Sequence, residues 1–334
     1  MDFKQISSAV ELDGLVKKYG ITLPIEQSPV WRKFEEAKGH KHYGWLLYQP
    51  EGQPRAVFAV VEYAIRSFKY FFSHHGPVWI GDKPSEAEER EFLEKLKQLK
   101  SLYPKMVFAR VHVWHRNEML YPAMDIVAYD KTVIADLTEE EDEILAKMSQ
   151  SGRRNIRKGL RNEGLEVVER TGDPQAMHEC YKIYEETAER DDFGIHPERV
   201  YQEMLDSLGS EHCRLFVAEN DGKPVAWAIV TVYDNQGVYY YGGSSRAAHR
   251  FYAPSLLHWR IMQTLRSEGI ESYDFMGIAS DLSPQLAGVT EFKKKFVREE
   301  TQVAAEWDLP FNKPIYLFLL AAKKIRATLR NIRK

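Results

Sequence analysis

The sequence predicts an α+β fold in which two similar units follow one another along the chain. The length of 334 residues is more than twice the roughly 150 residues of an ordinary domain. Hydrophobic residues make up 44% of the chain and aromatic residues 12%, which is enough to bury folded cores and excludes a disordered protein. The same order of strand and helix patterns occurs in each half, as expected of a duplicated unit.

The first half shows strand patterns followed by a helix and a further strand. Apolar periodicity and turn signals define these segments. In order they are a helix at 27–37, strands at 45–48 and 55–63 around a Pro50-Glu51-Gly52 turn, an extended aromatic segment at 71–80, a helix at 85–102 and a strand at 107–114.

The second half repeats this order after an acidic run at 139–143. Its segments are a helix at 174–208, strands at 214–219 and 225–233 around an Asn220-Asp221-Gly222 turn, a strand at 238–241, a helix at 254–267 and a strand at 272–275. We therefore assign residues 1–140 to the first unit and residues 141–308 to the second.

Composition and motifs exclude several classes of protein. Cys180 and Cys213 are too few for a disulfide framework and lack metal-ligand spacing, so we expect no metal site and a reducing compartment. The amino terminus lacks the apolar core of a secretory signal. The longest apolar run, 315–322, is far shorter than the roughly 20 residues that span a bilayer. We predict a cytoplasmic protein.

The formal net charge of −3 conceals a strongly basic segment at 149–161, SQSGRRNIRKGLR. On a helix, its cations fall on two neighbouring rows: Arg153, Arg157 and Arg161 on one, and Arg154 and Lys158 on the other. Like charges on one flank cost helix stability, and a bound polyanion would offset that cost. The alternative is a solvated basic face without a ligand.

Each predicted unit resembles the acetyltransferase (GNAT) fold, in which a mixed sheet opens at its middle to admit a thioester cofactor. Such enzymes bind the cofactor's pyrophosphate with a glycine-rich loop at the start of a helix. The corresponding segment here, 244–254, contains no glycine. This difference disfavours acetyl-CoA as a substrate.

A set of short motifs follows in order along nearly the whole chain. They are Gln27-x-x-x-Trp31, Gly76-Pro77-Val78, the basic segment running into Gly164-Leu165-Glu166-Val167, Phe216-Val217-Ala218-Glu219, Tyr239-x-Tyr241-Gly242-Gly243-Ser244, Tyr252-Ala253-Pro254, Tyr273-Asp274-Phe275-Met276-Gly277-Ile278 and Phe292-Lys293-Lys294-Lys295-Phe296. In this set the chain resembles the Fem family of peptidoglycan aminoacyltransferases. The lack of a sustained heptad pattern fits the compact form of that family, without a coiled-coil arm.

The resemblance implies two tandem GNAT-like domains that move an amino acid from aminoacyl-tRNA to an amine of a peptidoglycan precursor. The first domain is expected to bind the precursor, which is a nucleotide-linked or lipid-linked muramyl peptide. The second is expected to bind aminoacyl-tRNA, with the basic segment as a tRNA-binding element. The tail at 309–334 is expected to pack on the first domain. Because the ester already carries the activation energy, we expect no cofactor.

Lys293 is the candidate catalytic residue. Attack of an amine on an ester produces an oxyanion that a positive charge or a hydrogen-bond donor must stabilise, and the resemblance gives this role to the lysine of Phe292-Lys293. We expect the neighbouring Lys294, Lys295 and Arg298 to contact the tRNA. The alternative is a surface strand of alternating charge.

The resemblance also implies residues that bind the precursor. Tyr239 and Tyr241 share a strand face at i, i+2, and the resemblance places both, with Phe292, at the substrate. Lys33 falls where the family has a phosphate-binding lysine, although a lone lysine is more often a solvated charge. A family arginine that precedes a proline is replaced by His196, with Arg199 three residues later.

The family's Arg-x-Asp-Pro motif reads Arg110-Val111-His112-Val113 here. His112 therefore replaces an acid, and its imidazole has the pKa range of a base at neutral pH. The alternative is a structural or binding role.

The final segment, 315–334, begins apolar and ends basic. Its cations are Lys323, Lys324, Arg326, Arg330, Arg333 and Lys334. The pattern suits an amphipathic helix at an anionic membrane, and it also suits tRNA or simple core packing.

Three other functions stay open at this stage. The same fold can use another acceptor, such as a protein amino terminus or an exopolysaccharide sugar. The chain can be a non-catalytic protein that binds tRNA or precursor. It can also be a true acetyltransferase.

Overall fold

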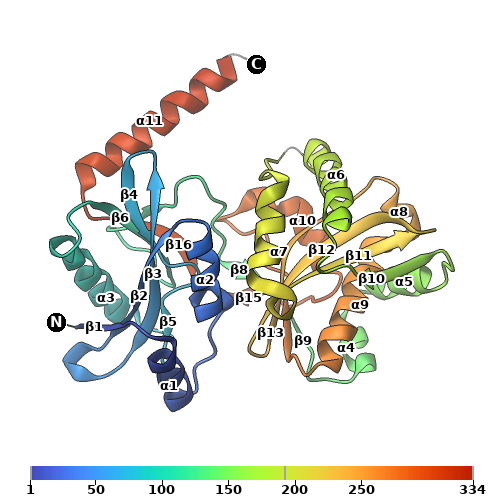
Figure 1. The fold of residues 1–334 in the computed structure, drawn as a ribbon, viewed down its shortest axis with the longest axis horizontal. Helices are drawn as coiled ribbons and strands as arrows, with labels where there is room; N and C mark the ends of the chain where they lie inside the picture. The colour runs from blue at the N-terminus through green and yellow to red at the C-terminus, as the bar shows by residue number, and fades with distance from the viewer. Residues whose placement is uncertain (1, 192, 333–334) are drawn as a thin grey trace. The chain divides into compact units, whose positions relative to one another are not determined.

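A computed structural model describes residues 2–191 and 193–332 and divides into two compact units (Figure 1). Unit 1 contains residues 1–129 and 303–334, and unit 2 contains residues 130–302. The structure divides the chain after residues 129 and 302, and not after 140 and 308 as expected. The reason is that two short strands each belong to the other unit than the one expected. Strand β9 (Ile134–Asp136) pairs within the sheet of unit 2, and β16 (Ala305–Pro310) pairs within the sheet of unit 1.

Unit 1 is built on a mixed sheet with the order β1-β2-β3-β4-β6-β16-β7, and β5 also pairs with β3. The strands are β1 (Phe3–Ile6), β2 (Lys41–Tyr48), β3 (Ala56–Ile65), β4 (Phe68–Phe72), β5 (Val78–Trp79), β6 (Met106–Val113) and β7 (Tyr121–Pro122). Neighbours are antiparallel except β4 and β6, which are parallel.

Serine side chains cap three helices of unit 1. The helices are α1 (Ala9–Tyr19), α2 (Pro29–Ala37), α3 (Glu86–Gln98) and α11 (Lys313–Ile332). Ser8, Ser28 and Ser85 each accept a hydrogen bond from a backbone N–H in the first turn of α1, α2 or α3. These caps explain where the three helices begin.

The carboxy-terminal helix α11 starts as part of the core of unit 1. Tyr316 and Leu319 are buried against Phe108 and its neighbours. Phe318 and Ile325 are exposed. Of the basic residues in the tail, Arg333 and Lys334 lie outside the described residues, as do the side chains of Arg326 and Arg330. No helix in the described part of the chain is long and apolar enough to span a membrane.

Unit 2 repeats the plan of unit 1 with the strand order β10-β11-β12-β13-β14-β9. The strands are β10 (Leu165–Glu169), β11 (Cys213–Asn220), β12 (Lys223–Tyr233), β13 (Gln236–Ser244) and β14 (Ser272–Asp274). Again one pair, β13 and β14, is parallel, and the other neighbours are antiparallel. The short strands β8 (Lys131–Thr132) and β15 (Thr301–Gln302) pair separately where the chain enters and leaves the unit.

Helices cover both faces of the unit 2 sheet. They are α4 (Glu141–Lys147), α5 (Gln150–Leu160), α6 (Pro174–Asp191), α7 (Glu198–His212), α8 (Ala248–Phe251), α9 (Ala253–Ser267) and α10 (Ala287–Lys293). Ala228 and Val230 of β12 belong to the core that contains α9, whereas Trp227 packs on Tyr184 of α6. The single helix expected at 174–208 is wrong, because α6 ends at Asp191 and a separate helix, α7, begins at Glu198 after its N-cap residue Pro197.

Candidate active site

The parallel pair of unit 2 opens at its carboxyl end. Strands β13 and β14 pair from Gln236 opposite Ser272 to Val238 opposite Asp274. Beyond this point the segment that follows β14 hydrogen-bonds to the segment that precedes β9. The Phe275 N–H donates to the Val133 carbonyl at 3.0 Å, and the Ile278 N–H donates to the Lys131 carbonyl at 2.9 Å. The described residues of β13 and β14 therefore no longer pair beyond Val238 and Asp274.

A groove of about 410 Å³ lies along the carboxyl-terminal half of β13, and we call it the unit 2 groove. Aromatic and small residues dominate its lining. The lining residues are Thr187, Arg190, Phe193, Ala226, Trp227, Tyr239, Gly242, Gly243, Ser244, His249, Pro254, Leu257, His258, Gly288, Val289, Glu291, Phe292 and Lys295. An apolar groove with a few polar groups is typical of a small-molecule site.

A β-bulge separates the two candidate tyrosines. Tyr241 lies opposite Ile229 and Tyr239 lies opposite Val230, so Tyr240 is the extra residue. Because Ile229 and Val230 are consecutive residues of β12, their partners point to opposite faces of the sheet. The expectation that Tyr239 and Tyr241 share a face is therefore wrong.

The packing of the two tyrosines agrees with this assignment. The Tyr239 ring contacts His258 of α9, with 4.5 Å between centroids. The Tyr241 ring contacts Tyr201 of α7, with 4.9 Å between centroids. Only Tyr239 lines the unit 2 groove. The role of Tyr241 in precursor binding stays a prediction.

Lys293 ends α10 and is buried beside the opening. Its Nζ donates to the carbonyls of Gly277 at 2.7 Å and Met276 at 3.1 Å, immediately after β14. Burial lowers the pKa of Lys293 to about 8, and Asp274 opposes this shift. The alternative of a surface strand is wrong, because residues 287–293 form a helix. Phe292, the preceding residue, lines the groove.

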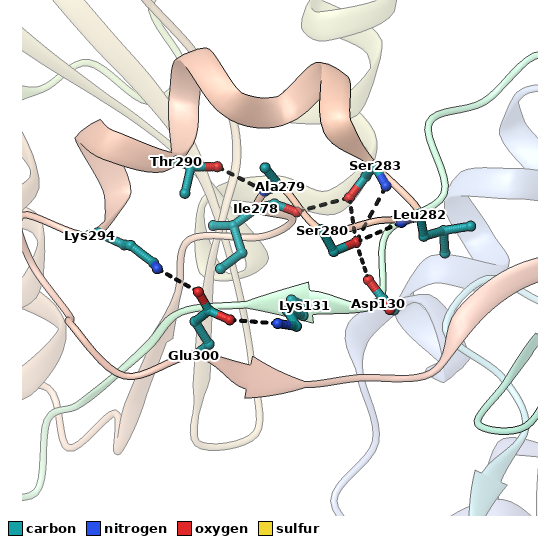
Figure 2. A network of polar contacts seen from close by, with 10 residues as sticks. All are labelled: Asp130, Lys131, Ile278, Ala279, Ser280, Leu282, Ser283, Thr290, Lys294 and Glu300. Carbon is teal, nitrogen blue, oxygen red and sulfur yellow. Dashed lines mark hydrogen bonds and ion pairs between the residues drawn. The ribbon is translucent and has the colours of Figure 1, made fainter.

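Polar contacts fix α10 and the loop before it (Figure 2). Glu300 accepts from Lys131 at 2.8 Å and from Lys294 at 2.5 Å. These two lysines hold the pKa of Glu300 down at about 2. Ser280 donates to Asp130 at 2.5 Å, and the Ala279 N–H donates to the Thr290 hydroxyl at 2.8 Å. The helix that carries Lys293 is thereby tied to the segment entering unit 2.

The basic segment forms α5, and its cations surround a depression of about 560 Å³ that we call the basic surface. Its lining residues are Gln150, Ser151, Arg153, Arg154, Arg157, Lys158 and Arg161. Arg154, Arg157 and Arg161 are exposed. Lys158 is exposed too, and its Nζ donates to the Tyr252 hydroxyl at 3.0 Å. Four cations thus face solvent together.

Arg153 is engaged within the protein. Its Nη1 donates to the carbonyls of Met148 at 2.6 Å and Ala146 at 3.2 Å, at the carboxyl end of α4. A cation there satisfies carbonyls that the helix leaves unpaired and interacts favourably with the helix dipole. Arg153 is thus a helix-capping residue, and a role in tRNA binding stays a prediction.

The three cations after Lys293 have different surroundings. Lys294 pairs with Glu300, as described above. Lys295 lines the unit 2 groove, with its Nζ 5.8 Å from the centroid of the Phe292 ring. The Arg298 Nε donates to the Lys147 carbonyl at 3.0 Å. Of the three, Lys295 alone reaches the groove.

The parallel pair of unit 1 remains closed. Strands β4 and β6 pair to Phe72 opposite Arg110. The Ser73 N–H then donates to the Arg110 carbonyl at 3.0 Å, and the His112 N–H donates to the Gly76 carbonyl at 2.8 Å. The cavity between these strands measures only about 10 Å³. The two copies of the fold therefore differ where a ligand would enter.

His112 is buried at the end of this closed pair. Its ring stacks on His75, with 4.7 Å between centroids, and its Nε2 lies 3.6 Å from the Glu306 carboxylate. Burial, together with the charges of His75 and Arg110, holds the pKa of His112 well below its usual range. A base needs access to its proton donor, and burial favours the structural alternative. The role of His112 as a base stays a prediction.

The remaining candidates lie on exposed surfaces. Lys33 is exposed on α2 of unit 1. In unit 2, His196 is exposed before α7, and Arg199 is 3.6 Å from Glu203. Their contacts with a precursor stay predictions.

The start of α9 lacks the donors of a pyrophosphate site. Tyr252 is in the left-handed conformation at the N-cap and makes no side-chain cap. Pro254 has no N–H, and the Ser255 N–H donates to the Tyr252 carbonyl at 3.1 Å. Backbone N–H groups at a helix start are what bind phosphate, so this end of the groove is poorly suited to coenzyme A.

Sequence reasoning missed His258, Trp227 and Arg190 of the groove. None of them lies in one of the motifs, and His258 has no periodic pattern that separates it from an ordinary core residue of α9. The proximity of these residues comes from the sheet and from the helices on both of its faces.

Comparisons with known proteins agree with this fold. Residues 146–294, within unit 2, match the family model of the acetyltransferase (GNAT) domain. Over 105 residues the chain is 29% identical to the aminoacyltransferase FemA of Staphylococcus aureus, which covers 31% of this chain and 25% of FemA. The match thus spans a quarter of that relative.

Two solved structures share the tandem arrangement. The crystal structure of FemX matches 95% of this chain and 99% of its own, with a TM-score of 0.73 at 15% identity. A tandem GNAT protein from the clavulanic acid biosynthesis pathway matches 92% of this chain and 98% of its own, with a TM-score of 0.56 at 11% identity. The predicted α+β fold of two tandem GNAT-like units is confirmed, and the described residues contain no coiled-coil arm. The chain is thus similar in sequence to FemA over 105 residues and similar in fold to FemX, and its second unit matches the GNAT domain.

Proposed function

We propose that the protein is an aminoacyltransferase that moves an amino acid from aminoacyl-tRNA to an amine of a peptidoglycan precursor stem peptide. The observation that carries the proposal is the open unit 2 groove beside Lys293, in a chain similar to an aminoacyltransferase. The open end of the sheet accepts an acyl group, and the poor phosphate site at α9 argues against coenzyme A as its carrier.

The aminoacyl ester lies in the groove, and the tRNA backbone lies along the basic surface. Four exposed cations there suit the electrostatic recognition of phosphates, which needs no base contacts. Lys295 extends positive charge toward the groove. We assign precursor binding chiefly to unit 1 through Lys33, and we keep His196, Arg199 and Tyr241 of unit 2 as candidate substrate-binding residues.

The reaction needs no cofactor. The amine nitrogen attacks the ester carbonyl carbon, and the carbonyl π electrons move to oxygen. Collapse of the tetrahedral intermediate expels the ribose oxygen of tRNA, which takes the proton released by the amine. Lys293 supplies positive charge for the oxyanion, a contribution that is commonly the largest in acyl transfer.

The test combines purified protein with mixed aminoacyl-tRNAs and either nucleotide-linked or lipid-linked muramyl pentapeptide. Mass spectrometry should show a precursor heavier by one amino acid residue, and it would identify that residue. A Lys293→Met variant serves as the control and should reduce turnover on the order of 10²–10³-fold. Precursors of unchanged mass, with charged tRNA present throughout, would contradict the proposal and favour a non-catalytic binding protein.

We further propose a cytoplasmic location with peripheral membrane contact through residues 315–334. Exposed Phe318 and Ile325 lie on the same helix as Lys323 and Lys324, a combination that suits an anionic surface. Sedimentation with anionic vesicles should exceed sedimentation with neutral vesicles, and Phe318→Ser should reduce it. Equal, low sedimentation with both vesicles would contradict this contact.

A further inference from the structure

His258 occupies the centre of an aromatic cluster at the unit 2 groove. It lies on α9 and is only 2% exposed, yet it lines the groove. Five aromatic rings have centroids within 6.0 Å of its own: Tyr239, Tyr273, Phe275, Phe292 and Phe296. Tyr239 and Phe292 are shared with the groove, whereas the other three belong to the buried core. The imidazole therefore sits between the core and the ligand space.

Tyr273 fixes the ring on its core side. The Nδ1 atom is 3.0 Å from the Tyr273 hydroxyl, and both residues are buried. A phenol is a stronger acid than a neutral imidazole N–H, so the hydroxyl is the donor and Nδ1 the acceptor. A neutral ring then carries its proton on Nε2. This second nitrogen has no hydrogen-bond partner among the described residues.

The surroundings keep this imidazole neutral. Burial, with a smaller contribution from the charge of Lys293, lowers the pKa of His258 to about 3. A neutral imidazole is a poor base at physiological pH, but it can polarise a carbonyl through its N–H. The nearby Lys293 has already committed Nζ to two carbonyls. A donor that faces the groove would add a direct hydrogen bond to the positive charge that Lys293 supplies.

We propose that His258 is a catalytic residue whose Nε2–H donates a hydrogen bond to the carbonyl oxygen of the aminoacyl ester. The inference rests on the proposed function. As the amine adds to the carbonyl carbon, the oxygen gains negative charge and the hydrogen bond strengthens. When the carbonyl forms again and the ribose oxygen leaves with the proton from the amine, the bond weakens. The proton of Nε2 stays on His258 throughout.

Two substitutions separate this role from a structural one. The amide nitrogen of glutamine can take the place of Nε2, whereas the amide of asparagine reaches only the place of Nδ1. His258→Asn therefore keeps a partner for Tyr273 and loses the donor, and we expect kcat to fall on the order of 10²–10³-fold with little change in KM. His258→Gln keeps the donor and should retain kcat at least about tenfold higher than His258→Asn. A purely structural role predicts the opposite order.

A third variant covers the case in which neither substitution folds. Tyr273→Phe leaves the ring in place and removes the group that selects its tautomer, so we expect kcat to fall several-fold at unchanged KM for aminoacyl-tRNA. Thermal melting checks the fold of each variant. A His258→Asn variant as active as the His258→Gln variant, or a Tyr273→Phe variant with wild-type kcat, would overturn the role of His258 and leave the proposed function standing. Absence of transfer by the wild-type protein would overturn the proposed function as well.

Discussion

At the scale of single residues, burial decides what a charged side chain can do. Lys293 and Arg153 both looked like ligands for an anion, but each donates to backbone carbonyls of its own unit. Lys293 lies beside the groove and has a lowered pKa, whereas Arg153 caps the carboxyl end of α4. Their substitutions therefore have different expected results.

The charge on Lys293 should give transfer an alkaline limit. Its pKa of about 8 lies within the range that an assay can cover, and the cation is lost as pH rises through that value. We expect kcat/KM to fall above about pH 8. Lys293→Arg keeps a charge at every assay pH, so its profile should lack this limb. Rates are corrected for ester hydrolysis without protein, and identical profiles for the two proteins would exclude the cation from the reaction.

Arg153 and Arg157 form a matched pair on one helix. Arg153→Ala should lower the free energy of unfolding by about 1–2 kcal/mol, because the α4 carbonyls lose a charged donor. Arg157 is exposed, so Arg157→Glu should leave thermal melting unchanged. It should weaken aminoacyl-tRNA binding and reduce the slope of log Kd against log salt by about one. An unchanged salt slope would remove Arg157 from the tRNA site.

At the scale of elements, α5 and α10 meet through a contact that only glycine permits. A Cβ on Gly152 would lie 2.3 Å from the Lys295 carbonyl oxygen. The Ser149 N–H also donates to that carbonyl, at 3.0 Å. The start of the basic helix is thus packed on the turn that follows Lys293.

Gly152→Ala should therefore separate the two elements. We expect a loss of about 1–3 kcal/mol of folding free energy from overpacking, together with reduced transfer. Gly14→Ala is the control, because a Cβ on Gly14 in α1 meets nothing within 4 Å. That substitution should stabilise the protein by about 0.5–1 kcal/mol through helix propensity. Chemical denaturation measures both, and equal effects would show that the contact is unimportant.

Glu300 links β8 to α10 through two lysines. Because its pKa is lowered to about 2, its stabilising effect is complete above the unfolded pKa of Glu, about 4.3, and is lost as pH falls toward 2. The carboxylate is largely solvated, so Glu300→Gln should lower the melting temperature only slightly. It should reduce transfer by loosening α10. Glu299→Gln, at an exposed neighbour, is the control; the same loss of transfer in both variants would contradict the linkage.

At the scale of the whole molecule, one fold occurs twice with different openings. The parallel pair of unit 1 is sealed by two further hydrogen bonds, whereas the pair of unit 2 separates after Val238. The two copies of the fold thus differ, because a groove lies along β13 in unit 2 and the corresponding cavity in unit 1 measures only about 10 Å³. The start of α9 shows why this groove differs from that of a coenzyme A enzyme.

Acetyl-CoA should therefore fail to stabilise the protein. A ligand present at 100 times its Kd adds about 2.7 kcal/mol to the folded state, which raises the melting temperature measurably. We expect no shift with millimolar acetyl-CoA and a clear shift with a stable aminoacyl-tRNA analogue. A rise that depends on acetyl-CoA concentration would favour the acetyltransferase alternative.

The sequence by itself determined the α+β class, the duplication, the order of strands and helices, and the family resemblance. These properties follow from periodicity and turn residues, which act over short stretches of chain. Only the tertiary structure decided that Tyr239 and Tyr241 face opposite ways, that β9 and β16 belong to different sheets, and that His258 borders the groove. Strand pairing and side-chain burial connect residues far apart in sequence, so no local pattern specifies them.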